Sequence, residues 1–213
     1  MAGHFSRKRI FNHMENSFNT AHRKALKKLF DQKMAESLPD FCYCRELDKE
    51  SFLVKGGLVY LSQEGDWHKS ILIKTPANGG EALFEPYIAW AKTFDEIKRV
   101  SKYGDTIGRN RRQIGDAGCI PIEQLWDSKW IKRRDRYFGT FSFSTRDWGF
   151  IDLMEGRKIT YSIKEATADV LPAFDSAWAY IDKYVRFFFG NIEKFMELDA
   201  DALDVEMEAL MAK

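Results

Sequence analysis

The sequence contains little cysteine, proline or glycine, and it has no excess of charge of either sign. Its 213 residues include 3 Cys, 5 Pro and 14 Gly, and 33 basic side chains stand against 32 acidic ones. This composition excludes collagen-like and low-complexity disordered chains, and the near-zero net charge favours neither a polyanion nor a polycation as partner. Three cysteines without a CxxC pair do not form a disulfide framework, so we expect a cytoplasmic protein.

The sequence also lacks a long apolar run. No stretch approaches the roughly 18 consecutive apolar residues that a membrane-spanning helix needs. The chain begins with basic residues, but Asn12, His13 and Glu15 follow before the apolar region of a signal peptide develops. We therefore expect a chain that stays in the cytoplasm and has no membrane partner.

The usual catalytic and metal-binding motifs are missing. The pair Cys42 and Cys44 has no second pair, and GxSxG, GxGxxG and P-loop sequences are absent. No HExxH spacing connects the four histidines, which are His4, His13, His22 and His68. The sequence thus predicts no metal, no cofactor and no enzymatic activity. Cys119 follows Gly118 in a segment without regular pattern, and the sequence leaves open whether its thiol is reactive.

Apolar and aromatic side chains are abundant in the sequence. Hydrophobic residues make up 45% of the chain and aromatic residues 15%. A chain of this length buries roughly 70% of its unfolded surface, so this composition supports a core without a covalent staple. We expect residues 1–213 to form a single α+β domain. Residues 191–213, with seven acidic side chains against two lysines, are a candidate acidic helical tail.

Three segments carry the signals of α-helices. In residues 5–36 apolar side chains recur at spacings of three and four, and Pro39 marks the end of the pattern. The sequence Thr-Phe-Asp-Glu at 93–96 is a capping box that predicts a helix start. A third helix is expected over 168–189, with Pro172 near its start.

Short segments rich in β-branched and aromatic residues, separated by glycine or acidic turns, are typical of antiparallel strands. They cover residues 41–47, 51–63, 67–74, 82–92, 137–143 and 159–163. Pro86 is expected to place at least part of its segment at a sheet edge or a bulge. We therefore predict an α+β fold with an N-terminal helix, a central antiparallel sheet of about five to six strands, and C-terminal helices packed on one face.

Basic and aromatic side chains gather in the middle of the chain. Residues 104–121 hold four glycines and an arginine cluster, which predicts an exposed loop, and an aromatic and basic segment follows it. Tryptophan, tyrosine and arginine are the residue types that dominate binding hot spots. The candidate binding residues are Arg109, Arg111, Arg112, Trp126, Trp130, Arg133 and Tyr137. We predict that they bind a protein partner.

Other interpretations of these residues remain open. Trp126 and Trp130 are four residues apart, which is also the spacing of one buried helical face with basic residues on its solvated side. A nuclease-like enzyme acting on nucleic acid would use the Arg-rich loop 104–121 with two acids and a lysine. The available trios are Asp48, Glu50 and Lys55, and Glu64, Asp66 and Lys69. Because no nucleic-acid-binding motif is present, we do not expect nucleic acid as partner, and a structural or self-associating role is the third alternative.

The last third of the chain shows an ordered set of segments. FSFSTRDWGFIDL at 141–153 and ITYSI at 159–163 are strand-like, and DVLPAFD follows at 169–175. This order resembles a bacterial family of small cytosolic proteins of unknown function, in which an N-terminal helix precedes an antiparallel sheet and an LPxFD-like turn leads into the C-terminal helix. Such families are related to immunity proteins of polymorphic toxins. The resemblance implies a protein that neutralises a toxin by binding it, although the loop 104–121 and the acidic tail depart from the family pattern.

Overall fold

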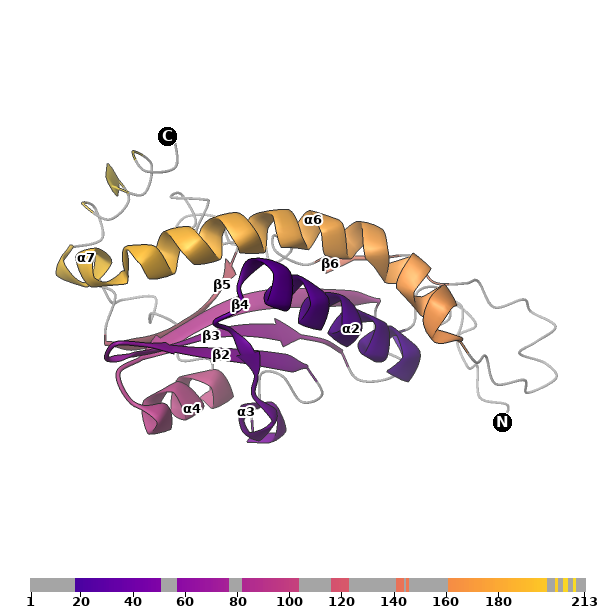
Figure 1. The fold of residues 1–213 in the computed structure, drawn as a ribbon, viewed down its shortest axis with the longest axis horizontal. Coiled ribbons are helices and arrows are strands. Elements are labelled where there is room, and N and C mark those ends of the chain that lie inside the picture. The colour runs from indigo at the N-terminus through magenta and orange to yellow at the C-terminus, as the bar shows by residue number, and fades with distance from the viewer. Residues whose placement is uncertain are drawn as a thin grey trace, which may run out of the picture.

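The structure is a computed structural model. It describes residues 18–50, 57–76, 82–103, 116–122, 141–143, 145 and 161–198, together with residues 202, 205, 206 and 209. These parts contain an antiparallel sheet, the helices that cover it and the core between them (Figure 1). The predicted α+β fold is therefore confirmed.

The first described helix is α2 (Thr20–Ser37). It begins at Asn19, whose side-chain oxygen accepts hydrogen bonds from the backbone N–H groups of Ala21 and His22 at 2.8 and 3.2 Å. These bonds satisfy two of the N–H groups that a helix start leaves without partners. The helix ends just before Pro39, as predicted, and the predicted helical residues 5–17 lie outside the described residues.

The sheet has the strand order β1-β2-β3-β4-β5, and β6 also pairs with β4. Its strands are β1 (Cys42–Tyr43), β2 (Leu58–Glu64), β3 (Trp67–Lys74), β4 (Leu83–Ala91), β5 (Ala117–Pro121) and β6 (Phe141–Ser142). In the turn between β2 and β3, Gly65 has φ 57°, a conformation that glycine adopts without strain. The strands predicted at 67–74 and 82–92 are thus confirmed.

Two segments differ from their prediction. Only Cys42–Tyr43 of the predicted strand 41–47 is extended, because Arg45–Glu50 forms the helix α3. The predicted loop 104–121 ends in a strand, since Ala117–Pro121 forms β5 along β4. Pairing with β4 supplies the backbone partners that a loop would have to find elsewhere.

Pro86 lies within β4, and on one side it pairs with Ile73 of β3. On the other side of β4, β5 ends opposite Tyr87 and β6 begins opposite Phe84. No described strand therefore pairs with Pro86 on that side. A residue that lacks an N–H group is tolerated where the ladder is interrupted.

Helices cover both faces of the sheet. Helices α2 and α6 (Ile163–Gly190) lie on one face, and α3 and α4 (Phe94–Tyr103) lie on the other (Figure 1). The larger core, with Phe30, Trp90 and Phe188, fills the space under α2 and α6. The smaller core, with Ile97 and Cys119, lies between the sheet and α4.

Helix α6 begins earlier than predicted. Ser162 and Glu165 form a capping box, in which the Ser162 hydroxyl oxygen accepts from the Glu165 N–H at 3.2 Å and the Glu165 carboxylate accepts from the Ser162 N–H at 2.9 Å. Ile163 is therefore helical. The prediction that residues 159–163 form a strand is wrong at this residue. Residues 159 and 160 lie outside the described part of the chain.

Pro172 lies inside α6, not in a turn before it. Its ring and its missing N–H disfavour a straight helix axis, and α6 changes direction in its N-terminal part (Figure 1). The helix ends at Gly190, as predicted, and α7 (Ile192–Glu197) follows. Among the helices that the structure describes, none combines the length and the apolar character needed to cross a bilayer.

Helices α2 and α6 run side by side in the same direction (Figure 1). Side-chain contacts join them near both ends. Near their N-termini, His22 Nε2 lies 3.1 Å from Asp169 Oδ2. Near their C-termini, the Arg186 guanidinium donates to the carbonyl of Ser37. Lys69 of β3 in turn donates to the Phe189 carbonyl of α6 at 3.3 Å. Arg186 thus binds a C-terminal carbonyl of α2, and Lys69 binds one of α6. A cation at this end of a helix complements the helix dipole.

Gly118 of β5 lies opposite Trp90 of β4, and the indole ring covers it. A Cβ atom on residue 118 would lie 2.5 Å from Cζ2 and 2.8 Å from Cη2 of Trp90. Trp90 is fully buried, and its ring centroid lies 5.0 Å from that of Phe188 in α6. The position therefore excludes any residue with a side chain unless the core rearranges.

Candidate binding surface around strand β6

Strands β5 and β6 lie on the same edge of β4 and run in the same direction. The end of β5 at Pro121 pairs with Tyr87, and the start of β6 at Phe141 pairs with Phe84. Three positions along a strand correspond to roughly 10 Å. The chain therefore leaves the sheet after Ile122 and returns at Phe141 close to where it left, and residues 123–140 form the connection.

The residues predicted to bind a partner all lie outside the described residues. Trp126, Trp130, Arg133 and Tyr137 belong to the connection 123–140, and Arg109, Arg111 and Arg112 belong to residues 104–115. These two segments are attached at opposite ends of β5, whose five residues span roughly 13 Å. The structure thus fixes the attachment points of the two groups but neither confirms nor refutes that the seven residues form one surface.

An aromatic group lies where the connection 123–140 returns to the sheet. The Phe141 ring stacks on Phe84 of β4, with centroids 5.6 Å apart, and the ring of Tyr180 of α6 lies at 6.2 Å. Tyr180 also stacks on Tyr184 at 6.1 Å, with the ring planes 13° apart. Tyr180 is 40% exposed although the neighbouring rings hold it in place. The group presents an ordered aromatic side chain to solvent.

Tyr184 forms the base of this aromatic group. Its side chain is buried, and burial, followed by the neighbouring Tyr180, raises the pKa of the Tyr184 hydroxyl above its usual value. The Lys183 ammonium lies 5.4 Å from the centre of the Tyr184 ring, within the range of a cation–π interaction. Tyr184 is therefore neutral near pH 7, and its ring packs against the ring of Tyr180.

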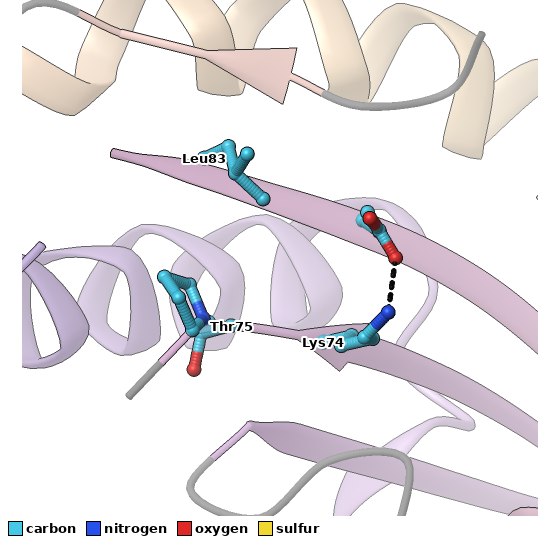
Figure 2. Close-up of a pocket in the computed structure, with 5 residues that line it drawn as sticks. Lys74, Thr75 and Leu83 are labelled. Atoms are coloured by element: carbon cyan, nitrogen blue, oxygen red, sulfur yellow. Dashed lines mark hydrogen bonds and ion pairs between the residues drawn. The ribbon is translucent and has the colours of Figure 1, made fainter. Parts of the chain in front are cut away.

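A small pocket lies between the ends of β3 and β4, and its lining residues Leu83 and Glu85 alternate with Phe84 along β4, so they face the other side of the sheet from the aromatic group. Its volume is about 280 Å³, and its lining residues are Lys74, Thr75, Pro76, Leu83 and Glu85. Figure 2 shows Lys74 and Leu83 on neighbouring strands, and a dashed line marks an ion pair between the two strands. That pair joins Lys74 Nζ to Glu85 Oε2 at 2.7 Å, and the same oxygen accepts from the Tyr87 hydroxyl at 3.0 Å. Leu83 pairs with Ser142 of β6, so the pocket lies close to β6 but on the opposite face of the sheet from Phe141.

The polar groups around the pocket are bonded to other groups of the protein. Arg23 of α2 donates from Nε to Thr75 Oγ1 at 3.4 Å and from Nη2 to the Pro76 carbonyl at 2.9 Å. Lys74 and Glu85 neutralise each other across the strands. The apolar walls, Leu83 and Pro76, are thus the part best suited to receive a ligand group. This arrangement favours an apolar side chain over a charged substrate.

The sequence context of Cys119 predicts a loop, and this prediction is wrong. Cys119 belongs to β5, points toward α4 and is fully buried. Burial raises the pKa of the Cys119 thiol to about 12, so the thiolate form is not populated near pH 7. The environment therefore answers the question that the sequence leaves open, because a buried thiol of this kind is not a nucleophile.

One of the two trios considered for a nuclease has a structural role. The Lys69 ammonium is buried, bonds to Glu64 and holds the Phe189 carbonyl of α6. The Lys69 hydrogen bond holds the pKa of the Glu64 carboxyl below its usual value. In the other trio, Lys55 and the side chains of Asp48 and Glu50 lie outside the described part. Within the described residues, no three or more His, Cys, Asp or Glu side chains gather as metal ligands would.

The chain matches no protein-family model, and no curated protein and no solved structure was found to match it. The resemblance to immunity-protein families stays a prediction. Residues 171–175, which carry the LPxFD-like sequence, lie inside α6 and not in a turn that leads into it.

The sequence analysis missed Phe141, Tyr180 and the pocket. For Tyr180 a signal exists, because it precedes Ile181 and so falls outside the stripe of buried residues on α6. An aromatic residue out of phase with the apolar stripe of a helix faces solvent. For Lys74 and Glu85 no such signal exists, because their contact depends on the register of two strands.

Proposed function

We propose that the protein is a cytoplasmic protein-binding module, and in its most concrete form an immunity protein that neutralises a toxin by binding it. In this proposal it is not an enzyme. The observation that carries the proposal is the exposed Tyr180 with Phe141, beside the point where residues 123–140 return to the sheet. Tyrosine, tryptophan and arginine carry much of the energy of protein interfaces, and the connection contains all three types.

The arrangement of the scaffold supports this proposal. A binding surface gains affinity when its side chains are ordered before the partner arrives. Tyr180 is held by Phe141 and Tyr184, and α6 is fastened to α2 near both ends. The aromatic group therefore loses little conformational freedom on binding.

The pocket at the ends of β3 and β4 supports the same proposal. Interface hot spots are often apolar or aromatic side chains seated in a pocket of the partner. The space between Leu83 and Pro76 offers such a seat, with the Lys74 and Glu85 pair at its rim. We propose that a toxin surface wraps around the short strand β6, from the aromatic group on one face of the sheet to the pocket at the ends of β3 and β4, and that the aromatic and basic residues of the connection extend this contact.

The test uses variants with matched exposure on one helix. Tyr180→Ala should lower affinity for the captured partner by at least about 2 kcal/mol, roughly thirtyfold, and lower the melting temperature by no more than a few degrees through the lost ring contacts with Phe141 and Tyr184. Ile163→Ala is the control, because Ile163 is 41% exposed on the same helix but lies 17 residues before Tyr180. The partner is captured from host lysate on immobilised wild-type protein, identified, and titrated against each variant.

The outcomes separate binding from catalysis. Equal affinity of the wild type and Tyr180→Ala for the captured partner would refute the role of the aromatic group. Capture of no partner, together with turnover of a nucleic acid that is lost on changing Asp48, Glu50 or Arg111, would refute the binding function and favour the nuclease-like enzyme. Trp130→Ala, if Trp130 lies at the interface, should behave like Tyr180→Ala.

A further inference from the structure

His22 occupies an unusual position for a titratable group. It is the third residue of α2, and its side chain is fully buried. Nδ1 accepts a hydrogen bond from the Asn19 N–H at 3.3 Å, and Nε2 lies 3.1 Å from Asp169 Oδ2. Because Nδ1 accepts, the single proton of the neutral ring is on Nε2, which donates to Asp169. The His22 side chain thus completes the N-terminal cap of α2 through Asn19 and links α2 to α6 through Asp169.

Aromatic side chains from three parts of the chain enclose the His22 ring. The nearest is Tyr161, just before α6, with ring centroids 4.7 Å apart, and Phe143 packs edge-on at 5.3 Å. Phe18 lies at 6.0 Å. Phe143 follows β6 directly, and its N–H donates to the carbonyl of Ala82 at 2.9 Å. The His22 ring is therefore the point at which α2, α6 and the end of β6 meet.

Few charged groups face the ring. From α6 the Asp169 carboxylate does, and from the residues before α6 the Tyr161 phenol does. The segment after β6 contributes Phe143, which carries no charge. On α2 itself the nearest charged neighbour is Arg23, whose guanidinium is directed at Thr75 and Pro76. Among the described residues, Asp169 is thus the one anion that faces His22.

Protonation of His22 breaks one of its two bonds. A proton on Nδ1 would face the Asn19 N–H, so that two donors point at each other and the cap loses its acceptor. The bond to Asp169 becomes an ion pair, but the ring has no access to water. Burial lowers the pKa of His22, and the hydrogen bond and charge of Asp169 act in the opposite direction but do not outweigh it.

We propose that His22 is an acid-sensitive clasp, whose protonation at acidic pH opens the N-terminal cap of α2 and loosens the junction of α2, α6 and β6. Phe141 of β6 belongs to the aromatic group on the surface, so the clasp also controls how firmly that group is held. The inference goes beyond the binding function and does not depend on it, since it concerns folding.

The direction of the pH effect follows from the lowered pKa. Above the ordinary pKa of histidine, about 6.5, the ring is neutral in both the folded and the unfolded chain, and the full contribution of the clasp is present. As the pH falls below that value, the unfolded chain binds a proton that the folded chain resists. The unfolding equilibrium constant then rises by up to about tenfold per pH unit until the folded protein also binds the proton.

The experiment measures urea unfolding of the full chain from pH 7.5 to pH 5.0. His22→Gln is the test variant, because a Gln side chain can accept from the Asn19 N–H, donate to Asp169 and still not titrate. We expect the unfolding constant of the wild type to rise by up to about tenfold per pH unit relative to His22→Gln below pH 6.5. Arg186→Ala, which removes the fastening at the opposite end, should lower stability equally at every pH.

An identical pH dependence of the wild type and His22→Gln would overturn the proposal. If His22→Gln does not fold, NMR titration of the wild type decides, with the His22 resonance identified by replacing His4, His13 and His68 in turn. A His22 pKa below 6.5, with shift changes in α6 over the same pH range, supports the clasp. A midpoint at or above that value refutes it.

Discussion

Replacing Gly118 by alanine tests the contact between β4 and β5 directly. Carbon atoms that are not bonded to each other approach to about 3.5–4.0 Å, and the added Cβ would lie 2.5 Å from Cζ2, 2.8 Å from Cη2 and 3.0 Å from Cε2 of Trp90. The ring cannot retreat freely, because it is fully buried against Phe188. One of the two strands or α6 must therefore move.

Overpacking of this kind costs about 1–3 kcal/mol. Three atoms of one rigid ring are involved, so we expect Gly118→Ala to reach the upper part of this range, about 2–3 kcal/mol. For a chain of this size that corresponds to a fall in melting temperature of roughly 4–12 °C. Circular dichroism melts and urea titrations of the same samples measure both quantities. Gly190→Ala is the control, because a Cβ there would meet no atom within 4 Å. It should leave stability unchanged or slightly higher.

A double-mutant cycle links the loss of stability to the indole ring. Trp90→Phe removes Cζ2 and Cη2, the two atoms that the new Cβ would approach most closely. Gly118→Ala should therefore cost less in the Trp90→Phe background than in the wild type, with a coupling energy of about 1 kcal/mol or more. The reasoning is refuted if Gly118→Ala is as stable as Gly190→Ala, or if its cost is the same in both backgrounds.

Two further predictions concern caps and thiols. Removal of either side-chain cap, by Thr93→Ala at α4 or Ser162→Ala at α6, should lower the free energy of unfolding by about 1 kcal/mol in urea titrations, because each hydroxyl oxygen accepts a backbone N–H at 3.2 Å. Iodoacetamide at pH 8 should modify the exposed Cys42 in the native protein and modify Cys119 only after denaturation, as mass spectrometry of the digested protein reports. Modification of Cys119 in the native protein at a rate close to that of Cys42 would contradict the burial of β5.

Elements with a strong local pattern could be predicted from the sequence. Strand β3 was bounded correctly because β-branched and aromatic residues fill it and the turn at Gly65 precedes it. The start of α4 was found because the Thr93 hydroxyl and Glu96 make the expected capping contacts. In both cases the deciding interactions join residues that are close in sequence.

The errors arose where a local preference competed with distant contacts. The β-branched and aromatic residues of 159–163 favour a strand by propensity, yet Ser162 caps α6 and Ile163 begins it. The alternative signal, a serine three residues before a glutamate, is present in the sequence and has priority when the following helix buries an apolar face. Helix α3 has six residues, too short to show a period.

The candidate surface depends still more on distant contacts. Phe141 meets Tyr180 because β6 pairs with β4 under α6, and no spacing along the chain encodes this meeting. The contact of Lys74 with Glu85 is set by the register of β3 and β4. The sequence therefore gives no access to the described positions that form the proposed surface.

The pairing of α2 with α6 has a consequence for synthesis of the chain. The contacts between these helices join residues 147 and 149 positions apart. At about 5–20 residues per second, a ribosome needs roughly 8–30 s to make the intervening chain. During that time Phe30, which packs against Phe174 and Trp178 of α6 in the finished protein, has no such cover. The nascent chain therefore carries an apolar helix face that suits a chaperone until the last long helix emerges.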